Sequence, residues 1–178
     1  MNHLEQLVAE WLQYKGYFVR VSVPVGPRAK GGFEGELDVV AVHLGTSHLL
    51  HVECSLDSLS SEKREQRFAA KFERGRIYIK DVFLGMPLPE KLEQVAVLQY
   101  ASGNVSYVGG VRLITVRELI REIFEGLEGT TPASKAVSSN LPLIRTLQLA
   151  SDASNKQSGE RRLLQNSGPM VHQPIEAV

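Results

Sequence analysis

The stretch GELDVVAVHLGTSHLLHVECS, residues 35–55, constrains the fold more than any other part of the chain. It contains two runs of strand-forming residues that are joined by a short turn around Gly45. Alternate residues of a strand point to opposite sides of a sheet, and here both sides are mostly apolar. Strands of this kind lie in the centre of a sheet, with helices on each face. The stretch therefore predicts a central β-hairpin within an α/β domain.

Each strand of this hairpin carries one carboxylate among its apolar residues, Asp38 on the first and Glu53 on the second. A two-residue turn that begins at Gly45 would place Asp38 directly opposite Glu53. A four-residue loop centred one residue later would pair Asp38 with Ser55 and leave the two carboxylates as diagonal neighbours. Like charges at opposed positions destabilise a sheet, so something should compensate for them.

A divalent cation would provide this compensation. Mg²⁺ binds one or two carboxylates together with water and phosphate oxygens, and it can activate water and stabilise charge on a phosphate. The alternative is that both carboxylates lie near strand ends and are simply solvated. Strand alternation also places His51 on the face of Asp38 and Glu53, to support the site or pack beside it, and turns the Cys54 side chain to the other face.

The rest of the sequence predicts the elements around the hairpin. We expect a helix over residues 3–15, a strand over 17–25, a Gly-rich loop over 26–35, a helix over about 57–74, strands within 92–101 and 111–115, and a closing helix over 116–127. This order indicates a single α/β domain over residues 1–128, with a central mixed sheet of about 4–5 strands flanked by helices.

The composition changes after residue 128. Ser, Thr, Asn, Gln, Gly and Pro become frequent, which is typical of a tail. We therefore expect a linker over residues 129–150, in which residues 140–150 form a short docking helix, and a disordered tail over residues 151–178.

Overall composition narrows the class of protein. Of the 178 residues 43% are hydrophobic, and the 20 basic and 20 acidic residues cancel, so an electrostatic surface for nucleic acid would have to be local. The single cysteine excludes an internal disulfide framework. The chain shows no secretory signal, and no apolar stretch approaches the roughly 20 residues that span a bilayer. We expect a cytoplasmic protein without a membrane partner.

The hairpin resembles the metal-binding core of the PD-(D/E)XK, or restriction-endonuclease-like, nuclease superfamily. Members carry G-E-[IL]-D-[ILV] on one strand and [FH]-V-E-x-K on the next, where this chain has GELDVV and HVECS. The segment LEQLVAEWLQYKGYFV is similar to the helix that precedes these strands in the Mrr-like and Holliday-junction-resolvase-like branches. The resemblance covers roughly residues 3–75 and implies a restriction-endonuclease-like domain with an αβββαβ core.

This resemblance implies a metal-dependent nuclease that hydrolyses DNA phosphodiester bonds with Mg²⁺ or Mn²⁺. Asp38 and Glu53 would bind the metal, with the carbonyl of Cys54 as a third ligand, and Glu5 would be an auxiliary acid on the first helix. Glu5 also fits an ordinary role in a first helical turn, where the helix dipole favours negative charge. DNA is the expected partner, and the sequence leaves open whether the chain forms a homodimer.

The chain departs from the superfamily pattern at Ser55, where the motif has a lysine. That lysine would polarise the attacking water or neutralise charge on the phosphate, and a serine hydroxyl cannot replace it. One alternative is therefore a catalytically inactive descendant that binds DNA or protein, and another is an unrelated α/β interaction module.

The helix that follows the hairpin offers a replacement for the missing lysine. Its cations recur at helical spacing, with Gln66 beside them: Lys63, Arg67, Lys71 and Arg74. Some superfamily members carry the lysine on this helix, and several branches keep a Gln there. We expect Lys63 to be the catalytic cation, because it is nearest the helix start, and Lys71 to be the second choice.

The remaining cations are candidate contacts for nucleic-acid phosphates. These are Arg67 and Arg74 on the helix, and Arg28 and Lys30 on the Gly-rich loop. The alternative is a solvated helix face, because glutamates accompany the cations of the helix.

Overall fold

The computed structural model describes residues 2–57, 59–101 and 105–166. Its centre is a mixed six-stranded sheet with the strand order β1-β2-β3-β4-β6-β5. The strands are β1 (Phe18–Pro27), β2 (Phe33–His43), β3 (His48–Ser55), β4 (Leu92–Leu98), β5 (Tyr107–Val108) and β6 (Val111–Thr115). β4 runs parallel to its neighbours β3 and β6, and the other pairs are antiparallel. The expected α/β class is confirmed, and β5 adds a short edge strand to the expected sheet.

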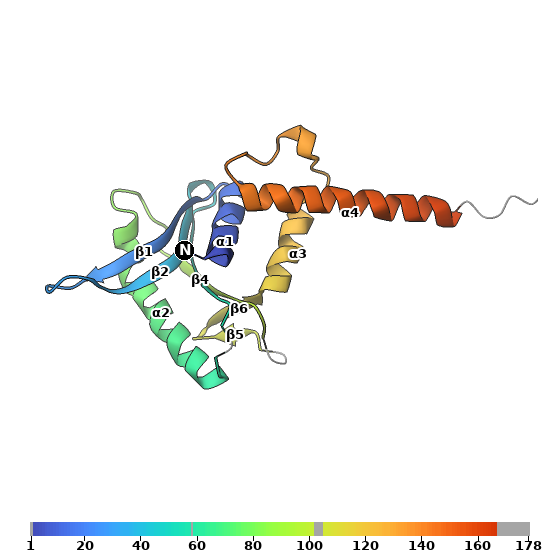
Figure 1. The fold of residues 1–178 in the computed structure, drawn as a ribbon. Coiled ribbons are helices and arrows are strands. Elements are labelled where there is room, and N and C mark those ends of the chain that lie inside the picture. The colour runs from blue at the N-terminus through green and yellow to red at the C-terminus, as the bar shows by residue number, and fades with distance from the viewer. Residues whose placement is uncertain (1, 58, 102–104, 167–178) are drawn as a thin grey trace, which may run out of the picture.

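Helices cover both faces of this sheet (Figure 1). Helix α2 (Ser61–Val82) lies on one face, and α1 (His3–Tyr14), α3 (Val116–Leu127) and α4 (Pro142–Asn166) lie on the other. Val39 and Val40, neighbours in β2, are both fully buried, one in the core beside α1 and the other in the core beside α2. The central strands are therefore apolar on both faces, as their sequence predicted.

The turn between β2 and β3 differs from the expected two-residue turn. A short 3-10 helix, η1 (Leu44–Thr46), fills the loop, and His43 Nδ1 accepts a hydrogen bond from the backbone N–H of Thr46 at 3.1 Å. Ser47, and not Gly45, adopts the left-handed conformation, with φ of 49°. The longer turn therefore uses a different residue to reverse the chain.

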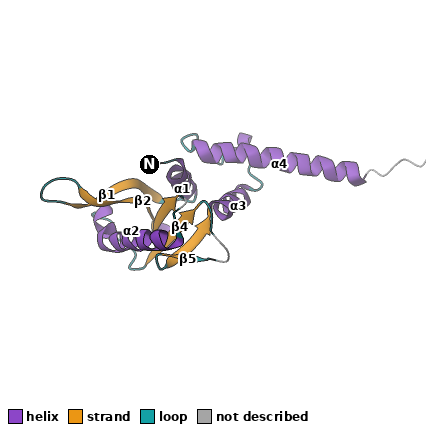
Figure 2. Cartoon of the chain, turned by 60° about the horizontal axis from the view of Figure 1, so that its bottom comes forward, coloured by secondary structure: helices purple, strands orange, loops and turns teal. Residues whose placement is uncertain are grey.

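The register of β2 on β3 is nevertheless the expected one. Val39 lies opposite Val52, and Val40 lies opposite His51. The next positions in the same register are Asp38 and Glu53. Here the ladder ends, and β2 continues only with β1 as a two-stranded arm that projects from the sheet (Figures 1 and 2).

This arm is longer than the sequence predicted. The expected Gly-rich loop over residues 26–35 shrinks to a tip of residues 28–32, because Pro27 still pairs with Phe33. Helix α2 is also longer than predicted and starts later, at Ser61. It continues beyond residue 74 because Ile79 and Val82 pack into the core beside Val40.

The C-terminal region also differs from the expected linker and tail. Helix α4 runs from Pro142 to Asn166, well past the boundary expected at residue 150. Its first turn is fixed by α1, because Glu10 Oε2 accepts hydrogen bonds from the backbone N–H groups of Leu143 and Ile144, at 2.7 and 3.2 Å. Residues 167–178 of the expected tail lie outside the described residues. In the described part of the chain, no helix is long and apolar enough to cross a membrane.

Candidate active site

Asp38 lies at the point where β2 separates from β3. Its Oδ2 accepts a hydrogen bond from the backbone N–H of Cys54 at 2.8 Å. The acceptor for this N–H group of β3 is thus the Asp38 side chain and not a backbone carbonyl of β2. The N–H and C=O groups of one residue in a strand point to the same neighbouring strand. The carbonyl of Cys54 therefore faces the same gap as Asp38.

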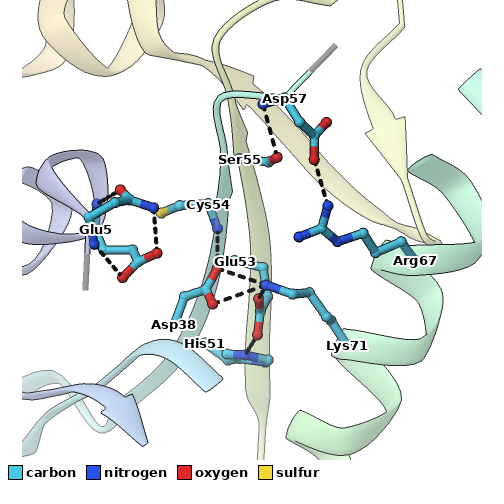
Figure 3. A network of polar contacts seen from close by, with 10 residues as sticks. Glu5, Asp38, His51, Glu53, Cys54, Ser55, Asp57, Arg67 and Lys71 are labelled. Atoms are coloured by element: carbon cyan, nitrogen blue, oxygen red, sulfur yellow. Dashed lines mark hydrogen bonds and ion pairs between the residues drawn. The ribbon is translucent and has the colours of Figure 1, made fainter. Parts of the chain in front are cut away.

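The ammonium group of Lys71 joins Asp38 to Glu53 (Figure 3). Lys71 Nζ donates hydrogen bonds to both carboxylate oxygens of Asp38, at 3.0 and 2.9 Å, and to Oε2 of Glu53. The exposed fractions of these side chains are 7% for Asp38, 0% for Glu53 and 14% for Lys71. Three carboxylate oxygens thus converge on one cation in a site with little access to water.

Glu53 has a second partner on the other side of its carboxylate. His51 Nε2 lies 2.8 Å from Glu53 Oε1, and both side chains are fully buried. The imidazole ring packs edge-on against Phe72 of α2, with 5.5 Å between ring centroids. As its alternation in the strand predicted, His51 lies on the α2 face, and the side chain of Cys54 lies in the core beside α1.

The surroundings separate the pKa values of the two acids. Burial and the nearby charge of Glu53 raise the pKa of Asp38 to about 7. Burial would also raise the pKa of Glu53, but its hydrogen bond with His51 and the charge of Lys71 outweigh burial and lower the pKa below its ordinary value. Burial disfavours the charged form of Lys71, yet the two carboxylates outweigh it and raise the pKa of this ammonium group. At neutral pH Glu53 and Lys71 are therefore charged. Asp38, with a pKa of about 7, is partly protonated at this pH.

An open cleft of about 450 Å³ borders this site. Side chains from α1, β2, the end of β3 and α2 line it, with Lys71, Arg67 and Arg74 along the α2 wall. Ser55, which stands where the superfamily motif has lysine, is buried here, and its Oγ accepts a hydrogen bond from the backbone N–H of Asp57 at 3.3 Å. Three cations thus line the same cleft as Asp38.

The structure brings Lys71, and not Lys63, to the carboxylates. Lys63 is exposed near the start of α2, and its side chain makes no hydrogen bond or ion pair with the described residues. It precedes Lys71 by eight residues, or about 12 Å along the helix axis. The middle of α2, and not its first turn, passes the carboxylates. The expected placement of Lys63 beside them was therefore wrong. Gln66 is likewise exposed and does not line the cleft.

Glu5 lines the cleft and also caps its own helix. The backbone N–H of Asn2 donates to Glu5 Oε2 at 3.0 Å, and Asn2 Oδ1 accepts from the backbone N–H groups of Leu4 and Glu5. This reciprocal pair is a capping box. The ordinary helix-terminal role that the sequence left open for Glu5 is therefore present in the structure.

The candidate phosphate contacts fall into two groups. Arg67 and Arg74 line the cleft; Arg67 pairs with Asp57 at 2.7 Å, and Arg74 lies against the backbone of Gly35, where an added Cβ would be 2.4 Å from its Nε. Arg28 and Lys30 are exposed at the tip of the β1–β2 arm and do not line the cleft.

Gln94 is a site residue that the sequence analysis missed. It lies next to His51 in the parallel register of β3 and β4, and its Nε2 is 3.1 Å from His51 Nδ1. A polar residue at a buried strand could have signalled a role, but the partner of Gln94 depends on a register that the sequence does not reveal.

In the part of the chain that the structure describes, no group of three or more His, Cys, Asp or Glu residues is arranged to hold a metal ion.

Comparison with known proteins gives few matches. No protein-family model matches the chain, and no curated protein matches it. Among solved structures, one described as "Crystal Structure of Protein of Unknown Function AF1548" is similar, with a TM-score of 0.42 and 12% sequence identity over 84% of this chain and 95% of that chain.

Proposed function

We propose that this protein is a metal-dependent nuclease of the PD-(D/E)XK type that hydrolyses DNA phosphodiester bonds. One observation carries the proposal: Lys71 joins Asp38 to the buried Glu53, and Lys71 and Asp38 line an open cleft together with Arg67 and Arg74. Cations at such a site can bind phosphates and stabilise the charge that develops on a phosphodiester during hydrolysis, and the opposed acids can hold a metal ion.

The donor atoms at the site fit Mg²⁺ or Mn²⁺. Asp38, Glu53 and the carbonyl of Cys54 would hold the ion with oxygen atoms alone, and such oxygen sets suit hard divalent cations. The convergence of three carboxylate oxygens on Lys71 Nζ supports this fit, because it marks a position where positive charge is stabilised. When bound, the ion would activate water and stabilise negative charge on the phosphate.

The chain itself would supply the remaining functions. Lys71 would take the role of the motif lysine, which Ser55 replaces in this chain. Its ammonium group would stabilise the charge that develops on the phosphate. Arg67 and Arg74 would hold neighbouring phosphates of the strand in the cleft, and Arg28 and Lys30 would contact the backbone farther along the DNA.

Cleavage assays test this proposal directly. Purified protein should cut at least one substrate among single-stranded, duplex and branched DNA when Mg²⁺ or Mn²⁺ is present, and EDTA should stop the reaction. Asp38→Asn and Glu53→Gln should abolish cleavage. Lys71→Met should lower the cleavage rate by about 100-fold or more, because it removes a cation that acts on the transition state.

Lys63→Met is the matched control, since it removes an exposed lysine of the same helix. It should leave the cleavage rate nearly unchanged. A wild-type protein that cuts none of these substrates with either metal would contradict the proposal. Cleavage activity that survives Asp38→Asn would contradict it as well.

A second candidate is a nuclease-fold protein that binds DNA or protein without cutting. Two observations favour it: Ser55 replaces the motif lysine, and Lys71 already neutralises the carboxylates. In that case calorimetry with Mg²⁺ and Mn²⁺ would detect no binding, and DNA binding measured by gel shift would survive Asp38→Asn and Glu53→Gln.

We further propose that the protein works in the cytoplasm. The single cysteine, Cys54, is free and buried, which suits a compartment that keeps thiols reduced. Detection of the protein in fractionated cells would test this location.

A further inference from the structure

The side-chain amide of Gln94 has its orientation fixed by two partners. Gln94 Nε2 lies 2.9 Å from the backbone carbonyl of Phe72, which can only accept a hydrogen bond. Gln94 Oε1 lies 2.7 Å from a guanidinium nitrogen of Arg76, which can only donate. A flipped amide would place two acceptors together and two donors together, so only one orientation satisfies both contacts.

This orientation decides which nitrogen of His51 carries the proton. The second hydrogen of Gln94 Nε2 points to His51 Nδ1 at 3.1 Å, so Nδ1 must accept. The proton of the imidazole therefore resides on Nε2, which lies 2.8 Å from Glu53 Oε1 and donates to it. His51 thus contacts a donor at one nitrogen and an acceptor at the other.

The hydrogen bond from His51 Nε2 gives the two carboxylate oxygens of Glu53 different partners. Oε1 accepts from His51 in the interior, and Oε2 accepts from Lys71 beside the cleft. The backbone of α2 approaches the imidazole closely enough to hold it in place: a Cβ added at Gly75 would lie 2.2 Å from His51 Nδ1. Glycine at this position leaves the space that the ring occupies.

We propose that His51 is a positioning residue: Gln94 holds it in one tautomer, and its Nε2–H binds Glu53 Oε1, so that Oε2 is directed to Lys71, which lines the cleft. The part of this inference that concerns a bound cation rests on the proposed function. The tautomer and the hydrogen bonds that set it do not, and they can be measured without metal, DNA or activity.

The first experiment measures the tautomer. Long-range ¹H–¹⁵N correlation spectra of the metal-free full-length protein should show His51 protonated on Nε2, with Nδ1 unprotonated. The signals are assigned by their loss in His51→Gln. A proton on Nδ1, or protons on both nitrogens, would overturn the inference.

The second experiment measures Mn²⁺ affinity by calorimetry. His51→Leu should weaken binding by about 10- to 100-fold, which is typical when a residue that orients a metal ligand is lost. His51→Gln should restore most of the affinity, because the glutamine amide can donate a hydrogen bond from nearly the position of Nε2. His48→Gln, a histidine of the same strand outside the cleft, is the matched control and should bind Mn²⁺ as the wild type does. Equal affinity in wild type and His51→Leu would overturn the positioning role.

Gln94→Met covers the case in which His51→Leu does not fold. It removes the donor to Nδ1 and should allow the Nδ1-protonated tautomer to appear in the spectrum, whereas an unchanged tautomer would overturn the role of Gln94. A wild-type protein that binds no Mn²⁺ would overturn the proposed function, and the spectrum would still decide the tautomer.

Discussion

At the scale of single residues, two acids on neighbouring strands acquire opposite properties from their partners. Glu53 is fully buried, but a hydrogen bond from His51 and the charge of Lys71 lower its pKa below the ordinary value. Asp38 is also buried and lies beside an ionised neighbour, which raises its pKa to about 7. Separated pKa values in a pair of acids are a common feature of catalytic sites, because the two groups can then perform different tasks at one pH.

This separation predicts how Asp38→Asn changes stability with pH. The pKa of Asp38 rises from 3.8 to about 7 on folding, so between these values the folded protein keeps a proton that the unfolded chain has lost. The stabilising contribution of Asp38 is therefore complete below pH 3.8 and is lost as pH rises through 7. Asparagine does not titrate. The stability of Asp38→Asn relative to wild type should thus increase from pH 5 to 7, by at most about 1.4 kcal/mol per pH unit, and then level off.

Urea denaturation in EDTA at pH 5, 6, 7 and 8 would measure this change. Saturating Mg²⁺ is the control for the wild type, because a bound cation favours the ionised carboxylate and should remove the pH dependence. A stability difference between variant and wild type that stays constant from pH 5 to 8 would contradict the raised pKa.

The sequence predicted part of this site and not the rest. The sequence limited the partner of Asp38 to Glu53 or Ser55, because strand alternation and a short connection restrict the register, but the choice between them depended on the turn. Lys63 was ranked before Lys71, and the structure reverses this order: both lie on the same helical stripe, and the choice depends on where α2 crosses the sheet. Gln94 could not be found, because its contact with His51 depends on the pairing of β3 with β4 across a long crossover.

At the scale of elements, α4 is positioned by α1 through one buried acid. Glu10 is 5% exposed, and its Oε2 accepts from the backbone N–H groups of Leu143 and Ile144. The first N–H groups of a helix have no partner within it, so Glu10 acts as a cap supplied by another helix. The sequence predicted a docking helix here from its apolar residues, but a cap donated from a distant part of the chain has no local pattern.

Glu10→Ala should destabilise the protein by about 1–3 kcal/mol, because it leaves buried N–H groups of α4 without an acceptor. Glu10→Gln keeps an acceptor oxygen at the same position and should lose less. Glu65→Ala, an exposed change on α2, should stay within about 0.5 kcal/mol of wild type. Urea denaturation would measure all three, and a loss in Glu10→Ala no larger than in Glu65→Ala would show that the cap is unimportant.

At the scale of the whole molecule, the hydrophobic core extends beyond the domain that the sequence predicted. Val137, Leu141 and Ile144 are 2, 5 and 0% exposed, and they belong to the same core as Trp11 and Ile123. The prediction ended the domain at residue 128 because the composition changes there. A few apolar residues within a polar segment were enough to continue the core, and composition averages conceal such residues.

Truncation after residue 128 should therefore unfold the protein, and truncation after residue 154 should not. Burial of a Val, Leu or Ile side chain contributes about 1.5–3 kcal/mol, so the loss of three approaches the total stability of about 5–15 kcal/mol for a typical domain. The shorter chain also exposes the apolar faces of α1 and α3 and leaves Glu10 without its backbone partners. Thermal unfolding followed by circular dichroism should show a cooperative transition for residues 1–154, near that of the full chain, and none for residues 1–128. If both truncated chains unfold at the temperature of the full chain, α4 is only an appendage of the fold.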